Sequence, residues 1–177
     1  MSTNSIQSEI REELRSARSK PAWQHLALAC VGDPEKVKVI VSFLTGEDTR
    51  LARTAAEVLR LMSDRDKSVA QPHIDELIET LAKPNHDAIK RSIFRLFQFL
   101  KFNDDQAGLV VELAFEHLQD RGNPIAVRVF AMTTVYNITK VYPELYDELV
   151  AVISTNLSEE STGFQNRAMK IINRKWK

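Results

Sequence analysis

An arginine recurs four times along the sequence, at intervals of 38, 37 and 39 residues. A leucine ahead of each arginine recurs at almost the same intervals, 37, 37 and 39 residues. The arginines are Arg53, Arg91, Arg128 and Arg167, and the leucines are Leu44, Leu81, Leu118 and Leu157. Because two independent markers share one period, the sequence is interpreted as a series of repeated units. A period in this range predicts small units that bury their apolar faces only by stacking on one another.

Each unit has the pattern of two helices joined by a polar turn. The first unit has an apolar stretch at 37–44, a turn at 45–48 and a second helix from Thr49 onward. Mostly apolar side chains recur two and five residues after each arginine, and these offsets lie on one face of a helix. The two rows are Ala55, Ile93, Phe130 and Met169, and Val58, Leu96, Thr133 and Ile172. With only 5 Gly and 6 Pro in 177 residues, the sequence predicts an all-α fold.

Several residues in the turns are suited to helix ends. Thr49 and Asp87 can cap the second helices of the first two units, and Pro124 suits the first position of a helix. Gly108 is different, because a glycine in a helix interior weakens the helix. We therefore expect a weak point in the first helix of the third unit.

This layout resembles the HEAT-repeat family, whose units are antiparallel helix pairs of about 40 residues with a recurrent arginine in the second helix. The best match is an acid at the start of the second helix followed by the recurrent arginine. It occurs as Asp48 with Arg53 and as Asp87 with Arg91. The third and fourth units depart from it, with Asn123 and Ser161 near the acid position.

The resemblance covers residues 33–177 and implies one continuous domain, an all-α right-handed superhelix (solenoid) of four helix pairs. The pairs would span 33–66, 67–102, 103–142 and 143–177.

Residues 1–32 are expected to form an N-terminal helical cap. Ile6, Ile10 and Leu14 give one narrow apolar stripe, which is the one-sided character that the end of a repeat stack needs. Trp23 and Trp176 lie near the two ends of the sequence, where large aromatic side chains can cover the ends of the stack.

Charge is distributed unevenly between the two helices of the units, although the 24 basic and 24 acidic residues of the chain balance. First helices and their leading turns hold thirteen acidic and three basic residues, whereas second helices hold fourteen basic and two acidic ones. In the HEAT-repeat family the second helices line the concave side, so the resemblance implies a basic concave face. That face would attract an acidic partner.

Two roles remain open for the second-helix cations. The four recurrent arginines, Arg53, Arg91, Arg128 and Arg167, can bond carbonyls and acids of neighbouring repeats and so be structural. Five further cations lie off that position and are the predicted partner contacts: Arg60, Arg95, Lys140, Lys170 and Arg174. The basic segment 173–177 is interpreted mainly as a solvated terminus.

The most favoured function is a non-enzymatic interaction scaffold or adaptor for an acidic protein or peptide. Nucleic acid is the alternative ligand, since phosphates would be attracted by the same face. The DNA alkylation repair glycosylases are the related enzymatic alternative, because their curved helical stacks hold a duplex against a basic face. Such enzymes need tryptophan and a catalytic aspartate there, whereas Asp87 is a candidate cap and Glu57 a candidate partner of Arg53 or Arg60.

No motif for catalysis, metals or cofactors is found in the sequence. The histidines, His25, His73, His86 and His117, lack His-x-x-x-His spacing, and no nucleotide-binding glycine loop occurs. We therefore expect no enzyme activity, no metal and no cofactor. Adenylosuccinate lyase activity is rejected as well, because that superfamily carries a Gly-Ser-Ser loop and this chain has no Ser-Ser pair.

The single cysteine, Cys30, excludes an intrachain disulfide and favours a reducing compartment. The N-terminus lacks the features of a secretory signal, and no apolar run is long enough to cross a membrane. A soluble, cytoplasmic protein with no membrane partner is expected. The oligomeric state and the identity of the partner are left open by the sequence.

Overall fold

The computed structural model describes residues 3–174, and every regular element within that range is helical. The α-helices are α1 (Thr3–Ser16), α2 (Lys20–Cys30), α3 (Pro34–Ser42), α4 (Thr49–Ser63), α5 (Ile74–Leu81), α6 (Asp87–Phe97), α7 (Asp104–Gln119), α8 (Ile125–Ile138), α9 (Leu145–Ser154) and α10 (Thr162–Ile172). Two short 3-10 helices are η1 (Gln71–His73) and η2 (Leu157–Glu159). The predicted all-α class and the pairing of helices along the chain are confirmed. Trp176 and the other residues of 175–177 lie outside the described range.

The chain divides into two compact units, Met1–Phe102 and Asn103–Lys177. The division coincides with the boundary predicted between the second and third repeats. Below, the first is called the N-terminal unit and the second the C-terminal unit, and each is described by itself.

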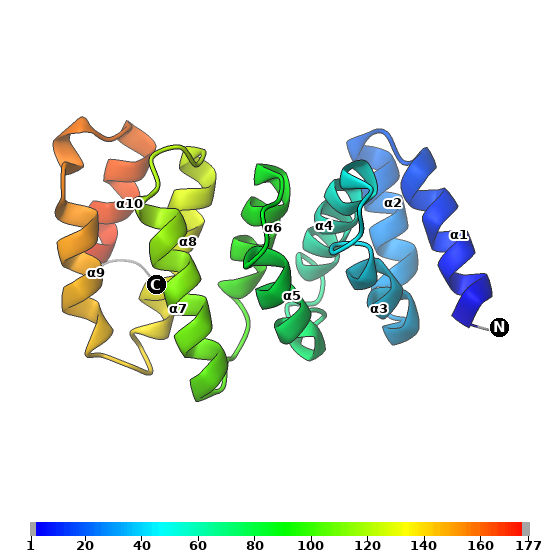
Figure 1. Cartoon of the computed structure of the whole chain (residues 1–177), viewed down its shortest axis with the longest axis horizontal. Helices are drawn as coiled ribbons and strands as arrows, with labels where there is room; N and C mark the ends of the chain where they lie inside the picture. Colours follow the sequence, from blue (N-terminus) through cyan, green and yellow to red (C-terminus); the bar gives the residue numbers. More distant parts are fainter. Residues whose placement is uncertain (1–2, 175–177) are drawn as a thin grey trace. The chain divides into compact units, whose positions relative to one another are not determined.

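Helices of the N-terminal unit form two layers (Figure 1). Helix α1 packs against α3 in one layer, and α2, α4 and α6 follow one another in the second layer, with α4 between its two neighbours. The segment predicted as a cap thus consists of two helices, each packed against α3 and α4. Its second helix, α2, extends the row of second helices.

The C-terminal unit contains two helix pairs (Figure 1). Helix α7 packs along α8, and α8 in turn contacts both α9 and α10. The buried side chains of α8 include Val127, Ala131 and Val135, all fully shielded from solvent. Helix α8 is thus the central helix of this unit.

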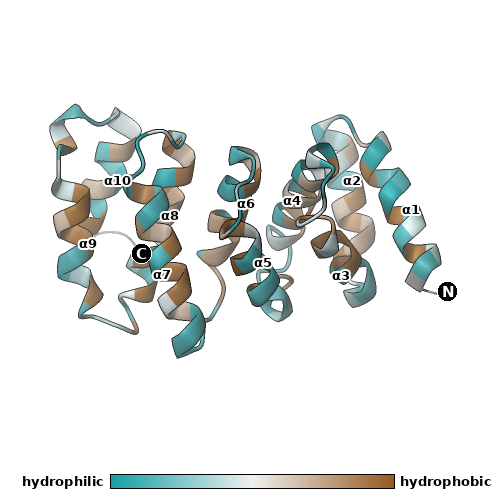
Figure 2. Cartoon of the chain, in the orientation of Figure 1, coloured by the Kyte–Doolittle hydropathy of each residue, from teal (hydrophilic) through white to brown (hydrophobic). Residues whose placement is uncertain are grey.

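Most of the predicted apolar rows lie in the core. Ala55, Val58, Ile93 and Leu96 are buried, and the helices carry distinct apolar and polar faces (Figure 2). Met169 differs from the prediction, because 46% of its surface is exposed. No later helix within residues 3–174 covers that face of α10.

Some helix starts differ from the predicted ones by one residue. Asp48, not Thr49, caps α4, and its carboxylate accepts hydrogen bonds from the backbone N–H groups of Arg50 and Leu51 at 3.0 and 3.1 Å. His86, not Asp87, is the capping residue of α6. The first turn of a helix has backbone N–H groups without a partner, and the side chain of the residue just before that turn is best placed to accept hydrogen bonds from them.

Candidate functional site

The N-terminal unit holds a pocket of about 330 Å³ lined by arginine side chains. We call it the arginine pocket. Its lining residues are Ala17, Arg18, Trp23, Arg50, Arg53, Thr54, Glu57, Ala88, Arg91 and Ser92. Four of the ten are basic and one is acidic, so the pocket suits an anion.

Helix periodicity explains why these residues meet. Residues 50, 53, 54 and 57 follow the i, i+3, i+4, i+7 spacing of one face of α4, and residues 88, 91 and 92 repeat that spacing on α6. Helices α4 and α6 are packed neighbours, so their two faces border one space. Arg18 comes from the link between α1 and α2, and Trp23 from the first turns of α2.

The pocket arginines differ in how far they are already engaged. Arg50 donates a hydrogen bond to the carbonyl oxygen of Arg15 at 2.6 Å, which anchors it. Arg91 lies 3.9 Å from the Glu57 carboxylate. Arg18 and Arg53 are exposed and form no ion pair with residues 3–174. These last two guanidinium groups have their full charge available for a ligand.

Glu57 is held by an arginine outside the pocket. Its two carboxylate oxygens accept hydrogen bonds from Arg60 at 3.0 and 2.7 Å. Arg60 also donates to Asp64 at 2.9 Å, and the hydrogen bond with Glu57 is the main reason that its pKa is raised above the ordinary value. The only carboxylate in the pocket lining is therefore neutralised in place.

Ser92 adds an unused hydrogen-bond donor to the pocket wall. Its side chain is 1% exposed, and its hydroxyl has no hydrogen-bond partner among the described residues. A buried serine or threonine in a helix commonly donates to the carbonyl four residues earlier, as Thr54 does to Arg50 at 3.1 Å. Because buried polar groups are seldom left unpaired, the Ser92 hydroxyl marks a place where a ligand or a water would be bonded.

Trp23 supplies an apolar wall with a fixed orientation. Its indole N–H donates to the carbonyl oxygen of Ala17 at 2.9 Å, and the side chain is half-buried. The bond ties the start of α2 to the end of α1. Trp23 is thus held at the edge of the arginine pocket.

None of the five predicted contact cations lines this pocket. Arg60 is only 17% exposed because of its two acidic partners, and Arg95 lies half-buried with its guanidinium 6.0 Å from the Phe99 ring. Lys140, Lys170 and Arg174 belong to the C-terminal unit. Within the N-terminal unit, Arg60 and Arg95 thus lie beside local partners outside the arginine pocket.

Two of those cations share a smaller pocket of about 210 Å³ in the C-terminal unit. Lys140 and Arg174 line it together with Tyr136, Thr139, Pro143 and Tyr146. The Arg174 guanidinium lies 4.4 Å from the centre of the Tyr146 ring, and the Lys140 ammonium lies 5.4 Å from that of Tyr136. Both cations are thus held beside aromatic rings.

The four repeat arginines divide into two kinds. Arg128 is 7% exposed, donates to the Leu118 carbonyl oxygen at 2.9 Å, and forms a paired interaction with Glu160 at 2.8 and 2.7 Å. Arg167 donates to the Thr133 hydroxyl. Arg53 and Arg91 instead line the arginine pocket. Arg128 also lines a pocket, of about 420 Å³, but there it is bonded to Glu160 and to the Leu118 carbonyl oxygen. Arg53 instead has no ion-pair partner among residues 3–174.

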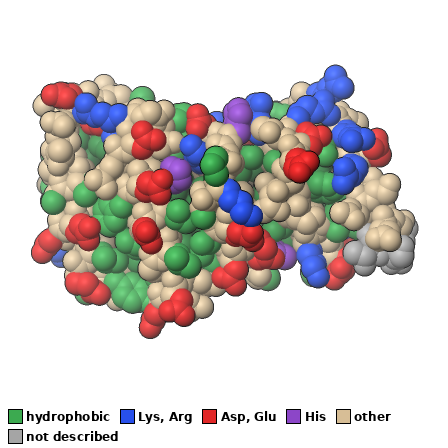
Figure 3. All heavy atoms as spheres, viewed as in Figure 1, with side chains coloured by type: hydrophobic (Ala, Val, Ile, Leu, Met, Phe, Trp, Pro, Cys, Tyr) green, Lys and Arg blue, Asp and Glu red, His purple; other side chains and the backbone are tan. Residues whose placement is uncertain are grey.

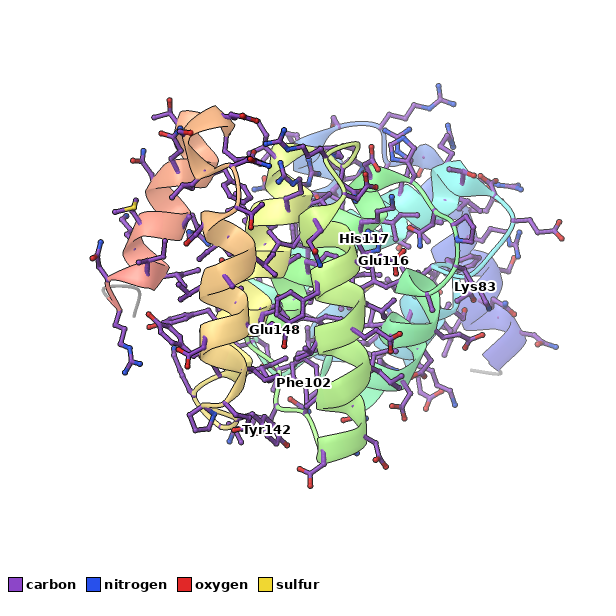
Figure 4. The ribbon with its side chains drawn as sticks, turned by 60° about the vertical axis from the view of Figure 1, so that its left-hand side comes forward. Lys83, Phe102, Glu116, His117, Tyr142 and Glu148 are labelled. Carbon is purple, nitrogen blue, oxygen red and sulfur yellow. The ribbon has the colours of Figure 1, made fainter. Side chains whose placement is uncertain are left out.

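The outer face of the C-terminal unit is acidic. Figure 3 shows mainly acidic and hydrophobic side chains over α7 and α9, among which Glu116 of α7 and Glu148 of α9 are labelled in Figure 4. Tyr142, also labelled there, donates from its hydroxyl to Asp104 at 2.5 Å and so ties the end of α8 to the start of α7. This distribution matches the acidic first helices counted in the sequence.

The single cysteine is not activated as a nucleophile. Cys30 is fully buried in α2, and desolvation raises the pKa of its thiol to about 11. A thiol with that pKa is almost entirely protonated near neutral pH. Within residues 3–174, no group of three or more His, Cys, Asp or Glu side chains is placed to hold a metal ion.

From the sequence, Arg53 and Arg91 were predicted to be structural, and Arg18, Arg50 and Ser92 were not predicted as site residues. The spacing of 50, 53, 54 and 57 on α4 was a usable signal, because four positions of one helix face were polar. No sequence pattern indicated Arg18 and Ser92, because they come close to the α4 residues only through the way three helices pack.

The comparisons with known proteins agree with this architecture. A family model for the HEAT repeat domain matches residues 10–175, so the chain belongs to the HEAT-repeat family. The match begins inside α1 and includes all of α2. HEAT repeats generally act as scaffolds or in protein interactions and are generally not enzymes. A comparison with curated proteins finds no match. No helix in the described part of the chain is long and apolar enough to cross a membrane.

Proposed function

We propose that this protein is a non-enzymatic interaction module that binds an acidic segment of a protein partner at the arginine pocket. The single observation behind the proposal is the pocket's composition, in which four arginines surround one carboxylate that is already paired. An acidic side chain that enters would meet Arg18 and Arg53, which have no carboxylate partner to displace. Binding there does not require an existing ion pair to be broken first.

The charge of the whole chain supports a protein ligand. The formal net charge is 0 at pH 7, so long-range attraction to a polyanion is weak and the positive potential is local. Several other second-helix cations are already paired with acids, as Arg60 is with Glu57 and Lys90 with Asp87. A nucleic acid needs cations along a track, because its phosphates repeat along the strand.

Within this proposal, Lys140, Lys170 and Arg174 are secondary contacts on the C-terminal unit. Lys140 and Arg174 line one small pocket and can hold a second acidic side chain of the same partner. Arg60 is assigned a positioning role, since its bonds to Glu57 and Asp64 fix a wall of the arginine pocket.

The test is fluorescence anisotropy with a short labelled glutamate-rich peptide, titrated with the full chain at low and near-physiological salt. Arg53→Glu is expected to weaken peptide binding by about tenfold or more, because a close charge contact becomes repulsive. Arg65→Glu is the matched control, since Arg65 is also exposed and lies outside the arginine pocket. Equal affinity of the two variants would contradict the proposal.

A second candidate function is the binding of DNA, with glycosylase activity. The observation that favours it is that Trp23 and Glu57 share the arginine pocket, so an aromatic ring and a carboxylate meet on a basic surface. The bonds from Arg60 to both oxygens of Glu57 count against it, since a carboxylate so paired stabilises a developing sugar cation less well. Duplex and single-stranded DNA in the same titration separate the two functions. The double variant Arg95→Glu, Lys170→Glu is titrated in the same way. It tests whether second-helix cations outside the arginine pocket contribute to DNA binding.

A further inference from the structure

Beyond the acidic peptide, we propose that the arginine pocket is a receptor for one phosphate monoester dianion, carried by a phosphorylated serine or threonine of the protein partner. The inference rests on the proposed function and names the group that the pocket holds. Three features carry it: the excess of guanidinium groups, the unused Ser92 hydroxyl, and the enclosure of the site in one pocket.

The guanidinium groups exceed what one carboxylate can neutralise. Arg18, Arg50, Arg53 and Arg91 line the pocket, and its only acid is held by Arg60. A carboxylate carries one negative charge and two oxygens, whereas a phosphate monoester carries about two charges near pH 7 and three acceptor oxygens. Planar guanidinium groups bind two oxygens of one phosphate at a time, so several can share the group.

The Ser92 hydroxyl gives the pocket a neutral donor beside the cations. It is buried, it has no partner among residues 3–174, and it lies on the same face of α6 as Arg91. A third phosphate oxygen can accept from this hydroxyl while the arginines bind the other two. A carboxylate has no third oxygen to offer.

The size of the pocket favours a side chain over a strand of nucleic acid. A volume of about 330 Å³ is at the lower end of the range of small-ligand pockets, about 300–1,000 Å³. It takes one charged headgroup, and the half-buried Trp23 at its edge gives an apolar surface for the adjoining part of the partner. Phosphate recognition by grouped arginines is a common way to read a modified peptide.

The experiment uses the full chain with Trp176→Phe, so that Trp23 is the only one of the 2 tryptophans left and its fluorescence reports on the pocket. The probes are inorganic phosphate, N-acetyl-O-phosphoserine amide and N-acetylglutamate amide. Saturable changes are expected with both phosphates, with the phosphoserine probe binding at least about tenfold more tightly than the glutamate probe. Lowering the pH to about 5 should weaken binding of the phosphoserine probe, because its dianion becomes a monoanion below its second pKa of about 6.

Three variants locate the binding. Arg53→Ala and Arg91→Ala should each reduce the phosphoserine affinity about tenfold, and Ser92→Ala about threefold with little change for the glutamate probe. Arg65→Ala should leave all affinities unchanged, and circular dichroism checks that each variant is folded. Ser92→Ala keeps the test valid if an arginine variant fails to fold.

The possible results separate this inference from the proposed function. Equal affinity for the phosphoserine and glutamate probes would overturn the phosphate assignment. The absence of a saturable phosphate response would overturn it too, if the glutamate-rich peptide still binds through Arg53. Either result leaves the acidic-peptide function standing. Loss of both responses would overturn both. Tighter binding of single-stranded DNA than of the phosphoserine probe, sensitive to Arg53→Ala, would replace the peptide with a nucleic acid.

Discussion

Arg53 and Arg128 occupy the same position in their repeats and have opposite surroundings. Arg128 is held by Glu160, which lies seven residues before the next repeat arginine, Arg167. The corresponding position before Arg91 is Pro84, which has no charge to offer Arg53. The residue at this position of the following turn is thus one difference between the surroundings of Arg53 and Arg128.

The Arg128–Glu160 pair predicts an acid-sensitive contribution to stability. The hydrogen bond from Arg128 lowers the pKa of Glu160 below its ordinary 4.5, so the stabilisation is complete above that pH and is lost as the pH falls through the lower folded-state pKa. Glu160→Gln should reduce the free energy of unfolding by about 1.5–3 kcal/mol at pH 7. Urea denaturation should find a much smaller difference near pH 3.

Glu159→Gln is the control for that prediction. Its side chain is 63% exposed and bonds only the exposed Arg121, so its substitution should change stability by less than about 1 kcal/mol. The difference in the free energy of unfolding between the wild type and Glu160→Gln should depend on pH. If it is the same at pH 7 and pH 3, the ion pair contributes nothing to stability.

Gly108 predicts a stabilising substitution. It lies inside α7, it is exposed, and a Cβ atom added there would meet nothing within 4 Å. Gly108→Ala should raise the free energy of unfolding by about 0.5–1 kcal/mol, because alanine loses less backbone entropy in a helix. Thermal and urea unfolding of the two proteins measure it. A destabilised Gly108→Ala would mean that this part of α7 packs more closely than described.

At the scale of the helix, the start of α4 can be tested directly. Asp48 accepts two backbone hydrogen bonds there, so Asp48→Ala should cost about 1 kcal/mol of stability. Thr49→Ala should cost little, since Thr49 is exposed and is already the first helical residue. Urea denaturation of both variants checks the assignment. A larger loss of stability in Thr49→Ala than in Asp48→Ala would show that Thr49 caps α4, as the sequence pattern predicted.

Helices were predictable from the sequence because their signal is local. The recurrent arginine and leucine predicted two helices in each unit from residue 33 onward, and the caps at Asp48 and His86 differ from the predicted ones by one residue. The fourth leucine, Leu157, lies in η2, whereas α9 already ends at Ser154. The arginine pocket was predictable only in part. The faces of α4 and α6 follow from spacing, whereas Arg18 and Ser92 join them through packing between helices that no local pattern encodes.

Across the whole molecule, the net charge is neutral although acidic residues are concentrated in the first helices and basic residues in the second helices. First helices carry more acidic than basic residues, and the second-helix cations are in part neutralised by neighbours such as Glu57 and Glu160. What remains is local positive charge at the arginine pocket and weaker positive charge around Lys140 and Arg174. A module of this kind selects an acidic group by local fit more than by long-range attraction.

Backbone amide chemical-shift mapping locates the bound peptide on the protein residue by residue. The ¹⁵N-labelled full chain is titrated with the glutamate-rich peptide at near-physiological salt. The largest shifts are expected in residues 17–23, 50–57 and 88–92, and they should vanish in Arg53→Glu. Shifts centred on α7 and α9, or shifts unchanged by Arg53→Glu, would show that the peptide does not bind at the arginine pocket.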